Sequence, residues 1–326
     1  MTFPTGGSPF VIQPALTAIA INRRNPTYTL IADNVMPRLA PVGTKHFRWL
    51  EYAPGMGMTI PDTQVGRKGL PRRIELSATE HFDECRDYGL EDAIPVDDVS
   101  QAAASVQAGG FSIDPVARSV EALTDLLALD REVRVATVAQ NPASYLAANV
   151  ATLAGAEQFS DFVDSDPIGT LLGLMDQMLM QPTSITFGQA VWTKFRQHPK
   201  VVKGVLGNAG DSGVVNRQQV ADLLEVKNIY VGAAWVNIAK PGQPVNRQRV
   251  WGKNVCMHFT DPTVTAESGI TWGLTQQYAV AGAVKYASTR QEASGLRGST
   301  VIRTGETVRE LVVALDCGAL ILNAVA

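Results

Sequence analysis

Two alternating strands separated by an unusually long connection constrain this chain most. Alternation predicts one strand over Lys45–Ala53 and a second over Arg73–Phe82. The connection has about 20 residues rich in Gly, Pro and Thr, whereas a hairpin loop usually has about 2–5. Its first part, Pro54–Pro61, reads PGMGMTIP and is incompatible with regular structure. Structureless loops of this length are uncommon inside compact domains and are often functional. The sequence therefore predicts a functional two-stranded arm spanning Gly43–Phe82.

The arm and the segment after it carry opposite charges. The arm's tip is positive, and the following residues, up to position 98, include Arg86 as their only basic residue. The basic residues of the tip are Arg67, Lys68, Arg72 and Arg73, and the acidic residues that follow are Asp83, Glu84, Asp87, Glu91, Asp92, Asp97 and Asp98.

Composition bounds the class of protein. The chain has 326 residues, 45% of them hydrophobic and 18% charged, which is typical of one large globular domain or two ordinary ones. A net charge of −3 gives no indication of a dedicated nucleic-acid binder. No apolar run reaches about 18 residues, so no membrane span is expected. Three scattered cysteines favour a reducing, cytoplasmic origin over a disulfide framework.

The rest of the chain predicts an α+β fold with a mixed sheet. Residues 1–42 are interrupted by six prolines yet are apolar, so we expect this segment to pack on its own body or on a neighbour. A small-residue linker is expected over Ser100–Ser112. A long helix is predicted over Asp114–Gln140, capped by Asp114 with Pro115 in its first turn. Helices are expected from 167, 189 and 217, and strands over 184–188, 227–239, 254–260, 270–278 and the C-terminal stretch.

Motifs for chemistry are scarce. Cys256 and His258 share a face of a predicted strand, but two ligands are too few for a zinc site. Ser212 lies in GDSG, a motif found around the nucleophile of chymotrypsin-like proteases, but the sequence shows neither that family's continuation nor its catalytic-base segment. No phosphate-binding glycine motif is present. The sequence therefore predicts no catalytic, metal or cofactor site and no enzyme.

The order of segments resembles the major capsid proteins of tailed bacteriophages, which have the Hong Kong 97-like fold. The segments are an apolar arm, an extended loop, a long helix and an α/β region, and they cover most of the chain. The local sequences RRIELSATEHFDECRDYGLEDAIP and FRQHPKVVKGV are also similar to those of phage coat proteins of this type.

The resemblance implies a division into named parts. These are an N-terminal arm (1–42), an extended loop (43–82), a peripheral domain (83–166) with its spine helix (114–140), an axial domain (167–298) and a return to the peripheral domain (299–326). It also implies a subunit that self-assembles as hexamers and pentamers into an icosahedral head shell around double-stranded DNA. The protein would lie in the virion after assembly in the host cytoplasm.

Partners follow from the same resemblance. We expect a separate scaffolding protein, a portal, a decoration protein and non-specific contact with packaged DNA, with no membrane involved. We also expect the basic tip of one copy to face the acidic residues of positions 83–98 in a neighbour. Three alternatives stay open: an encapsulin-like compartment, another phage structural protein such as a tail-tube subunit, and a hydrolase using Ser212 or Cys256 under a mobile lid.

Overall fold

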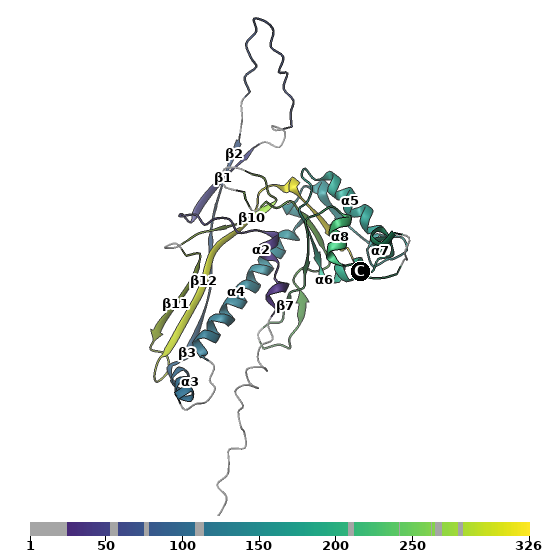
Figure 1. Ribbon diagram of the computed structural model, residues 1–326. Coiled ribbons are helices and arrows are strands. Elements are labelled where there is room, and N and C mark those ends of the chain that lie inside the picture. The colour runs from purple at the N-terminus through teal and green to yellow at the C-terminus, as the bar shows by residue number, and fades with distance from the viewer. Residues whose placement is uncertain are drawn as a thin grey trace, which may run out of the picture.

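The protein is described by a computed structural model that covers residues 25–52, 58–74, 78–107, 114–207, 212–240, 242–261, 263–264, 269–279 and 283–326. It is an α+β protein with two main sheets on either side of a long helix and a hairpin that projects from the body (Figure 1). None of its described helices is long and apolar enough to cross a membrane.

The central helix, α4, spans Pro115–Ala139, in agreement with the prediction. Asp114 caps it by accepting a hydrogen bond from the Val116 amide, and Pro115 occupies the first turn, where its missing N–H costs nothing. At about 1.5 Å per residue, 25 residues extend roughly 38 Å, so α4 crosses the body. The helix passes beside one sheet and ends near the other (Figure 1).

The first sheet is antiparallel and is built around β12 (Ser299–Val312). On one side β12 pairs with β3 (Arg86–Pro95), and on the other with β11 (Lys285–Glu292) and β10 (Gly273–Gln277). Buried and less buried positions alternate along β12, as expected for a sheet with one covered face. Helix α4 and the short helix α3 (Val96–Gln107) pack at this sheet.

The second sheet is mixed and contains the larger core. Its order is β4 (Val150–Thr152), β13 (Gly318–Leu322), β9 (Val255–His258), β5 (Ser184–Gly188) and β6 (Asn228–Gly232). All of β5 and β9 is buried, as expected for the inner strands of a sheet that is covered on both faces. The helices α5 (Pro167–Gln177), α6 (Gln189–Phe195), α7 (Pro199–Leu206) and α8 (Arg217–Leu223) contribute to the same core.

Two hairpins lie outside these sheets. Strands β1 (His46–Tyr52) and β2 (Ala78–Glu84) form the hairpin that projects from the body (Figure 1), and β7 (Trp235–Asn237) pairs with β8 (Arg247–Arg249). Short helical turns complete the described part of the chain: η1 (Thr27–Thr29), α2 (Ala32–Val35), η2 (Pro142–Ser144), η3 (Ala147–Asn149), η4 (Gly155–Glu157) and η6 (Leu315–Cys317).

The structure corrects several predicted elements. The expected linker over Ser100–Ser112 is wrong up to residue 107, because α3 runs to Gln107; its alanines and glutamines are good helix formers, and Asp97 and Asp98 favour its first turn. The second strand of the arm begins at Ala78, so Arg73 and Ile74 lie before it. The single strand expected over 227–239 is divided at 233–234 into β6 and β7, which belong to different sheets.

Sheet membership does not follow the predicted domain boundaries. Strands β10 and β11 lie before residue 298 but pair in the sheet of β3 and β12. Strand β4 lies before residue 166, and β13 lies after residue 299, yet both belong to the five-stranded sheet. The chain therefore passes between the two sheets more often than the sequence indicated. Of the predicted N-terminal arm, only residues 25–42 are described.

Gly188 gives a test of the second sheet. A Cβ at this position would overlap the carbonyl oxygen of Gly252 and lie 2.9 Å from that of Trp251. Because backbone must move to make room, we expect Gly188→Ala to lower the free energy of unfolding by about 1–3 kcal/mol or more. Gly173, in α5, has open space around it, so Gly173→Ala should instead add roughly 0.5–1 kcal/mol. Urea unfolding of both variants measures the difference, and equal effects would contradict the described packing.

Candidate assembly surfaces

The projecting hairpin has one partly covered face and one open face. On the first face, the Phe47 and Trp49 rings stack with centroids 5.9 Å apart, and the Trp49 ring stacks on His81 at 5.2 Å. His81 is also 2.7 Å from the Glu51 carboxylate. On the opposite face, Leu50 and Phe82 are 50% and 72% exposed. Among the described residues, no further strand pairs with this hairpin. An isolated two-stranded hairpin is at best marginally stable in water.

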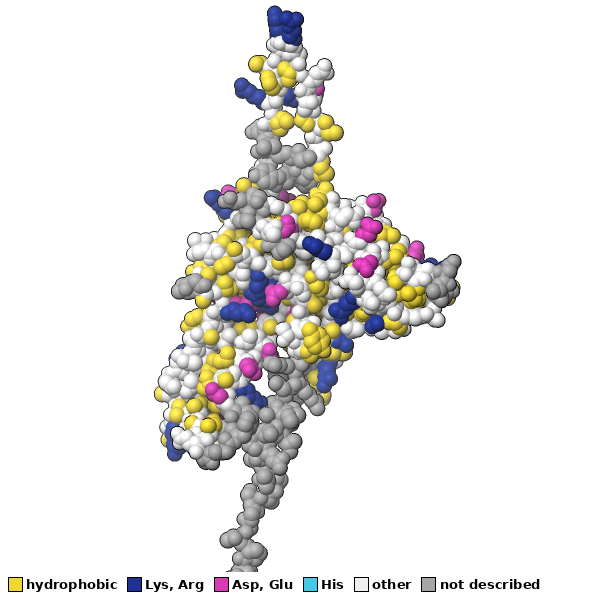
Figure 2. Space-filling model, in the orientation of Figure 1, with side chains coloured by type: hydrophobic (Ala, Val, Ile, Leu, Met, Phe, Trp, Pro, Cys, Tyr) yellow, Lys and Arg dark blue, Asp and Glu magenta, His cyan; other side chains and the backbone are white. Residues whose placement is uncertain are grey.

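The tip of the hairpin, residues 58–74, combines apolar and basic side chains. Ile60 and Leu70 are 93% and 91% exposed, and Figure 2 shows the basic tip above the body. The four predicted basic residues, Arg67, Lys68, Arg72 and Arg73, are all exposed, and within the described part of the chain none of them forms an ion pair. Large exposed aliphatic groups at such a density are typical of a surface that another protein covers.

Most of the acidic residues expected to receive this tip already have partners in their own chain. Asp87 pairs with Lys45 at 2.6 Å and Asp83 with Arg309 at 2.6 Å. The hydrogen bond from Lys45, with one from Thr307, holds the pKa of the Asp87 carboxyl below its usual value. The remaining contacts are Glu91 with Arg303 and Arg290, Asp97 with Arg297, Asp92 with the Ser119 hydroxyl, and Glu84 with His46.

Three of the seven acidic residues therefore have no lysine or arginine partner in the described chain: Glu84, Asp92 and Asp98. If the ion pairs within the chain stay intact in an assembly, the predicted contact with the basic tip is limited to these three carboxylates. The single chain brings none of the four basic residues next to the seven acidic ones.

A buried carboxylate joins the N-terminal segment to α4. Glu132 is fully buried, and its two oxygens accept hydrogen bonds from the Ile31 and Ala32 amides at 3.0 and 2.8 Å. One of them also accepts a bond from the Trp251 indole at 2.6 Å. Burial raises the pKa of Glu132 even though these three donors oppose the shift. Glu132 therefore holds three separate segments at one point.

The neighbouring Arg131 extends this connection. Arg131 is 2% exposed, and its guanidinium donates to Asp33 at 2.6 Å, to the Met36 carbonyl at 3.2 Å and to the Thr275 hydroxyl at 3.2 Å. Burial acts to raise the pKa of Asp33, but Arg131 and Arg38 together bring it below its usual value. Arg38 in turn pairs with Glu306 of β12 at 2.9 Å. We call Arg131 and Glu132, with these partners, the helix clamp.

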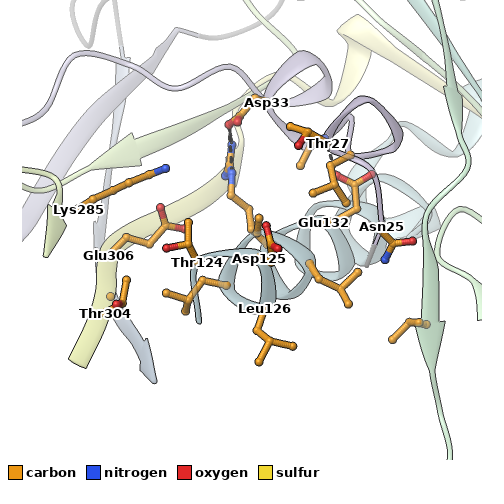
Figure 3. A pocket seen from close by; sticks show the side chains of 18 of the residues that line it. Asn25, Thr27, Asp33, Thr124, Asp125, Leu126, Glu132, Lys285, Thr304 and Glu306 are labelled. Carbon is orange, nitrogen blue, oxygen red and sulfur yellow. Dashed lines mark hydrogen bonds and ion pairs between the residues drawn. The ribbon is translucent and has the colours of Figure 1, made fainter. Parts of the chain in front are cut away.

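A groove opens beside the helix clamp. It has a volume of about 1160 Å³, with α4 as its floor, the β11–β12 edge on one side and the β7–β8 hairpin on the other. Figure 3 shows Leu126 and Asp125 of α4 between Glu306 and Lys285 on the sheet side and Asn25 of the N-terminal segment. Tyr286, Trp235 and Leu126 line it and are 52%, 42% and 53% exposed. The groove is thus an open apolar surface rather than a closed ligand cavity.

The residues of the alternative hydrolase prediction do not form a catalytic site. Ser212 is exposed, and within the described residues it has no hydrogen bond to a histidine or carboxylate. Cys256 is buried, donates to the Ala139 carbonyl at 3.3 Å, and has its pKa raised to about 12 by burial, so it is held as an unreactive thiol.

His258 is buried beside Cys256 and contacts the Tyr145 hydroxyl at 2.9 Å, and burial lowers its pKa to about 3. Its ring packs on Trp272 with centroids 3.9 Å apart. In the described part of the chain, no group of three or more His, Cys, Asp or Glu could hold a metal ion. Cys256 and His258 are therefore both buried on β9 and belong to the packed interior.

Comparison with known proteins supplies the family. The chain is 39% identical over 321 residues to the major capsid protein of Pseudomonas phage JBD67, which covers 98% of this chain and 99% of the relative. The chain belongs to the family of phage major capsid proteins. A second relative, the major capsid protein of Burkholderia phage BcepMu, is 26% identical over 76% of each chain. No family model matches.

Solved structures agree on the fold of this capsid protein. A phage-related protein of Bordetella bronchiseptica RB50 superposes with a TM-score of 0.65 at 22% identity, covering 95% of this chain and 96% of that one. The capsid structure of cyanophage P-SCSP1u gives 0.52 at 12% identity, covering 87% and 85%. The predicted Hong Kong 97-like class is therefore confirmed. Membership of this family favours a structural role over the hydrolase alternative, and a phage capsid over an encapsulin-like compartment.

Sequence reasoning identified the hairpin but missed the helix clamp. Arg131 and Glu132 were placed in a helix without a role, although they lie in a run of charged residues, Asp130 to Glu132 followed by Arg134, in its C-terminal half. Their partners lie about 100 residues away in Ile31, Ala32 and Asp33. That pairing depends on tertiary structure, so helical periodicity alone could not reveal it.

The helix clamp leads to a direct stability test. Replacing Glu132 with Ala leaves three buried donors without an acceptor, at about 1–3 kcal/mol each. We therefore expect Glu132→Ala to lower the free energy of unfolding by at least about 3 kcal/mol. Glu121 is on the exposed face of the same helix, so Glu121→Ala should change stability by no more than about 0.5 kcal/mol. Urea unfolding compares the two, and a small loss in the Glu132 variant would contradict the clamp.

Proposed function

We propose that this capsid protein assembles with copies of itself, as hexamers and pentamers, into the icosahedral head shell of a tailed phage that encloses double-stranded DNA. Support comes from its family, and the observation that carries the proposal is the projecting hairpin. Leu50, Phe82, Ile60 and Leu70 are exposed on an element that the described part of the chain leaves uncovered. A second subunit is the cover that a self-assembling shell provides, since extended elements add contact area without a larger core.

The hairpin acts as an extended loop that clamps a neighbouring subunit. Its apolar side chains supply most of the affinity, because exposed ion pairs contribute only about 0–1 kcal/mol each. Arg67, Lys68, Arg72 and Arg73 set the register by facing acidic residues of the neighbour, first among them Glu84, Asp92 and Asp98. These three are favoured because the other four carboxylates already pair with bases of their own chain.

In this proposal, the arm, loop, spine helix and two domains of the capsid fold are assigned from the observed strand pairing. Residues 1–42 are the N-terminal arm, β1–β2 with its tip is the extended loop, and α4 is the spine helix. The sheet of β3, β10, β11 and β12 with α3 forms the peripheral domain. The five-stranded sheet with α5–α8 forms the axial domain.

Other partners follow from the same role. A separate scaffolding protein, a portal and a decoration protein join the shell, and packaged DNA is contacted non-specifically. Assembly takes place in the host cytoplasm, and the finished protein is part of the virion. An encapsulin-like compartment is the second candidate for a closed shell; DNA inside purified particles favours the head, and a cargo enzyme favours the compartment.

Charge reversal at the tip tests the proposal. We expect the double variant Arg72→Glu with Arg73→Glu to reduce the yield of closed particles at least tenfold, because the tip then repels the neighbour's carboxylates. Negative-stain electron microscopy and sedimentation measure the yield. The matched control is Lys203→Glu with Arg217→Glu, which makes the same change of charge at exposed positions on α7 and α8.

The control should form particles as the natural sequence does, and circular dichroism should show that both variants are folded. Normal particles from the tip variant would contradict the role given to the basic residues. Failure of the unmodified protein to form closed shells under any assembly condition would contradict the proposed function itself.

A further inference from the structure

The groove beside α4 exposes apolar side chains from several separate elements. Leu126 of α4, Trp235 of β7 and Tyr286 of β11 line it from three separate elements, and each is between 42% and 53% exposed. Val245, before β8, adds a side chain that is 67% exposed. Contiguous apolar groups of this kind, including two aromatic rings, are typical of a surface that binds another segment.

Several charged side chains that line the groove are paired within the chain. Asp33 pairs with Arg131 at 2.6 Å and with Arg38 at 2.9 Å, and Glu306 pairs with Arg38 at 2.9 Å. Glu132 is covered by its three hydrogen bonds. Lys285 and Arg247 line the same groove without an ion pair in the described chain. An occupant therefore needs no charge, and a basic occupant would meet Lys285 and Arg247.

The described chain begins at the rim of this groove. The Asn25 side chain donates to the Trp235 carbonyl at 2.9 Å and accepts a hydrogen bond from the Trp235 amide at 3.0 Å. This pair fixes Asn25 against the β7–β8 hairpin. The 24 residues that precede Asn25 are therefore tethered to the groove.

The composition of that preceding segment matches the groove. Residues 1–22 contain no Asp, Glu, Lys, Arg or His, while positions 10–21 contain Phe10, Val11, Ile12, Leu16, Ile19 and Ile21. Among the described residues, the hairpin tip also exposes large apolar side chains, Ile60 and Leu70, but it carries four basic residues. Charge thus favours residues 1–22 over the tip of a second copy as the occupant.

We propose that residues 10–22 cover the groove of their own chain. From Val120 to Glu132 the floor extends 12 residues along α4, or roughly 18 Å at 1.5 Å per residue. About six extended residues at roughly 3.3 Å each span that length, so the segment has enough chain to turn after Asn25 and enter. Tethering makes this binding intramolecular, which raises the effective concentration of the segment at the groove.

Site-specific photocrosslinking tests this occupant. Tyr286 is replaced with photoreactive benzoylphenylalanine in the full-length protein, and ¹⁵N-labelled and unlabelled chains are mixed in equal amounts before irradiation. Trypsin cleaves after Arg23 and after Arg290, so the segment and the probe are released as one joined peptide pair for mass spectrometry. We expect residues 1–23 to be the main crosslinked peptide, with both halves carrying the same isotope label.

Two sets of variants control the result. The same probe at Phe82, on the hairpin, should crosslink residues 1–23 at least fivefold less. Ile19→Asp with Ile21→Asp should reduce the Tyr286 crosslink at least fivefold, because charge would enter an apolar groove. The matched pair Thr5→Asp with Ser8→Asp adds the same charge outside residues 10–22 and should leave the yield unchanged.

Three results would overturn the inference: pairs of mixed isotope label, which place the segment in a second copy; crosslinks to residues 58–74 in place of 1–23; and no crosslink to 1–23. Particle formation is scored separately by electron microscopy. A lost crosslink with intact shells counts against this inference alone, and a retained crosslink without shells counts against the proposed function alone.

Discussion

The pair of buried charges on the central helix is the interaction on which the described body depends. Glu132 binds the backbone of the N-terminal segment and the indole of Trp251, and Arg131 binds Asp33, the Met36 carbonyl and Thr275. Trp251 follows the β7–β8 hairpin, and Thr275 lies in β10 of the first sheet. Buried charges are costly unless every one is paired or hydrogen bonded, so these contacts must form together. The helix clamp therefore fixes how the sheets and the N-terminal segment meet α4.

The projecting hairpin has no comparable anchor. Its strands contact each other, and near its base Lys45 pairs with Asp87 and Asp83 with Arg309. Fully burying one large apolar side chain contributes about 1.5–3 kcal/mol, so covering Leu50, Phe82, Ile60 and Leu70 outweighs the exposed ion pairs at the tip. In the proposed assembly, the body of the subunit is stable by itself and the arm gains its stability from a neighbour. That division suits a shell whose subunits fold before they assemble.

Sequence reasoning reached the parts of the fold that local patterns determine. Asp114 and Pro115 predicted the start of α4, and the two alternating strands with their long glycine- and proline-rich connection predicted the hairpin. The sequence-based predictions were wrong where the pairing of strands distant in sequence determines the structure. Gly232, Ala233 and Ala234 looked like the middle of one strand, but the chain changes sheets there. The exposed strand β11 has little apolar alternation, and it forms because β12 offers it an edge.

The candidate assembly surfaces, too, could be predicted only where they depend on local sequence. The basic tip was visible as a run of charge, and its exposure agrees with the sequence. The sequence did not indicate that four of the seven carboxylates are paired within the chain, with Lys45, Arg297, Arg303 and Arg309. Three of these bases lie about 200 residues further along the chain than the carboxylates that they contact. The groove was also hidden, since its walls come from four separate segments.

Hydrogen exchange most directly tests the central claim, that the body is stable by itself whereas the hairpin needs a neighbour. Amide exchange is compared between subunits kept apart at low concentration and assembled particles. We expect amides of β1 and β2 to be protected at least about 100-fold more in particles, because an isolated hairpin is only marginally stable. Amides of the buried strand β5 should be protected equally in both. Equal protection of β1 and β2 in separate subunits and in particles would contradict the account.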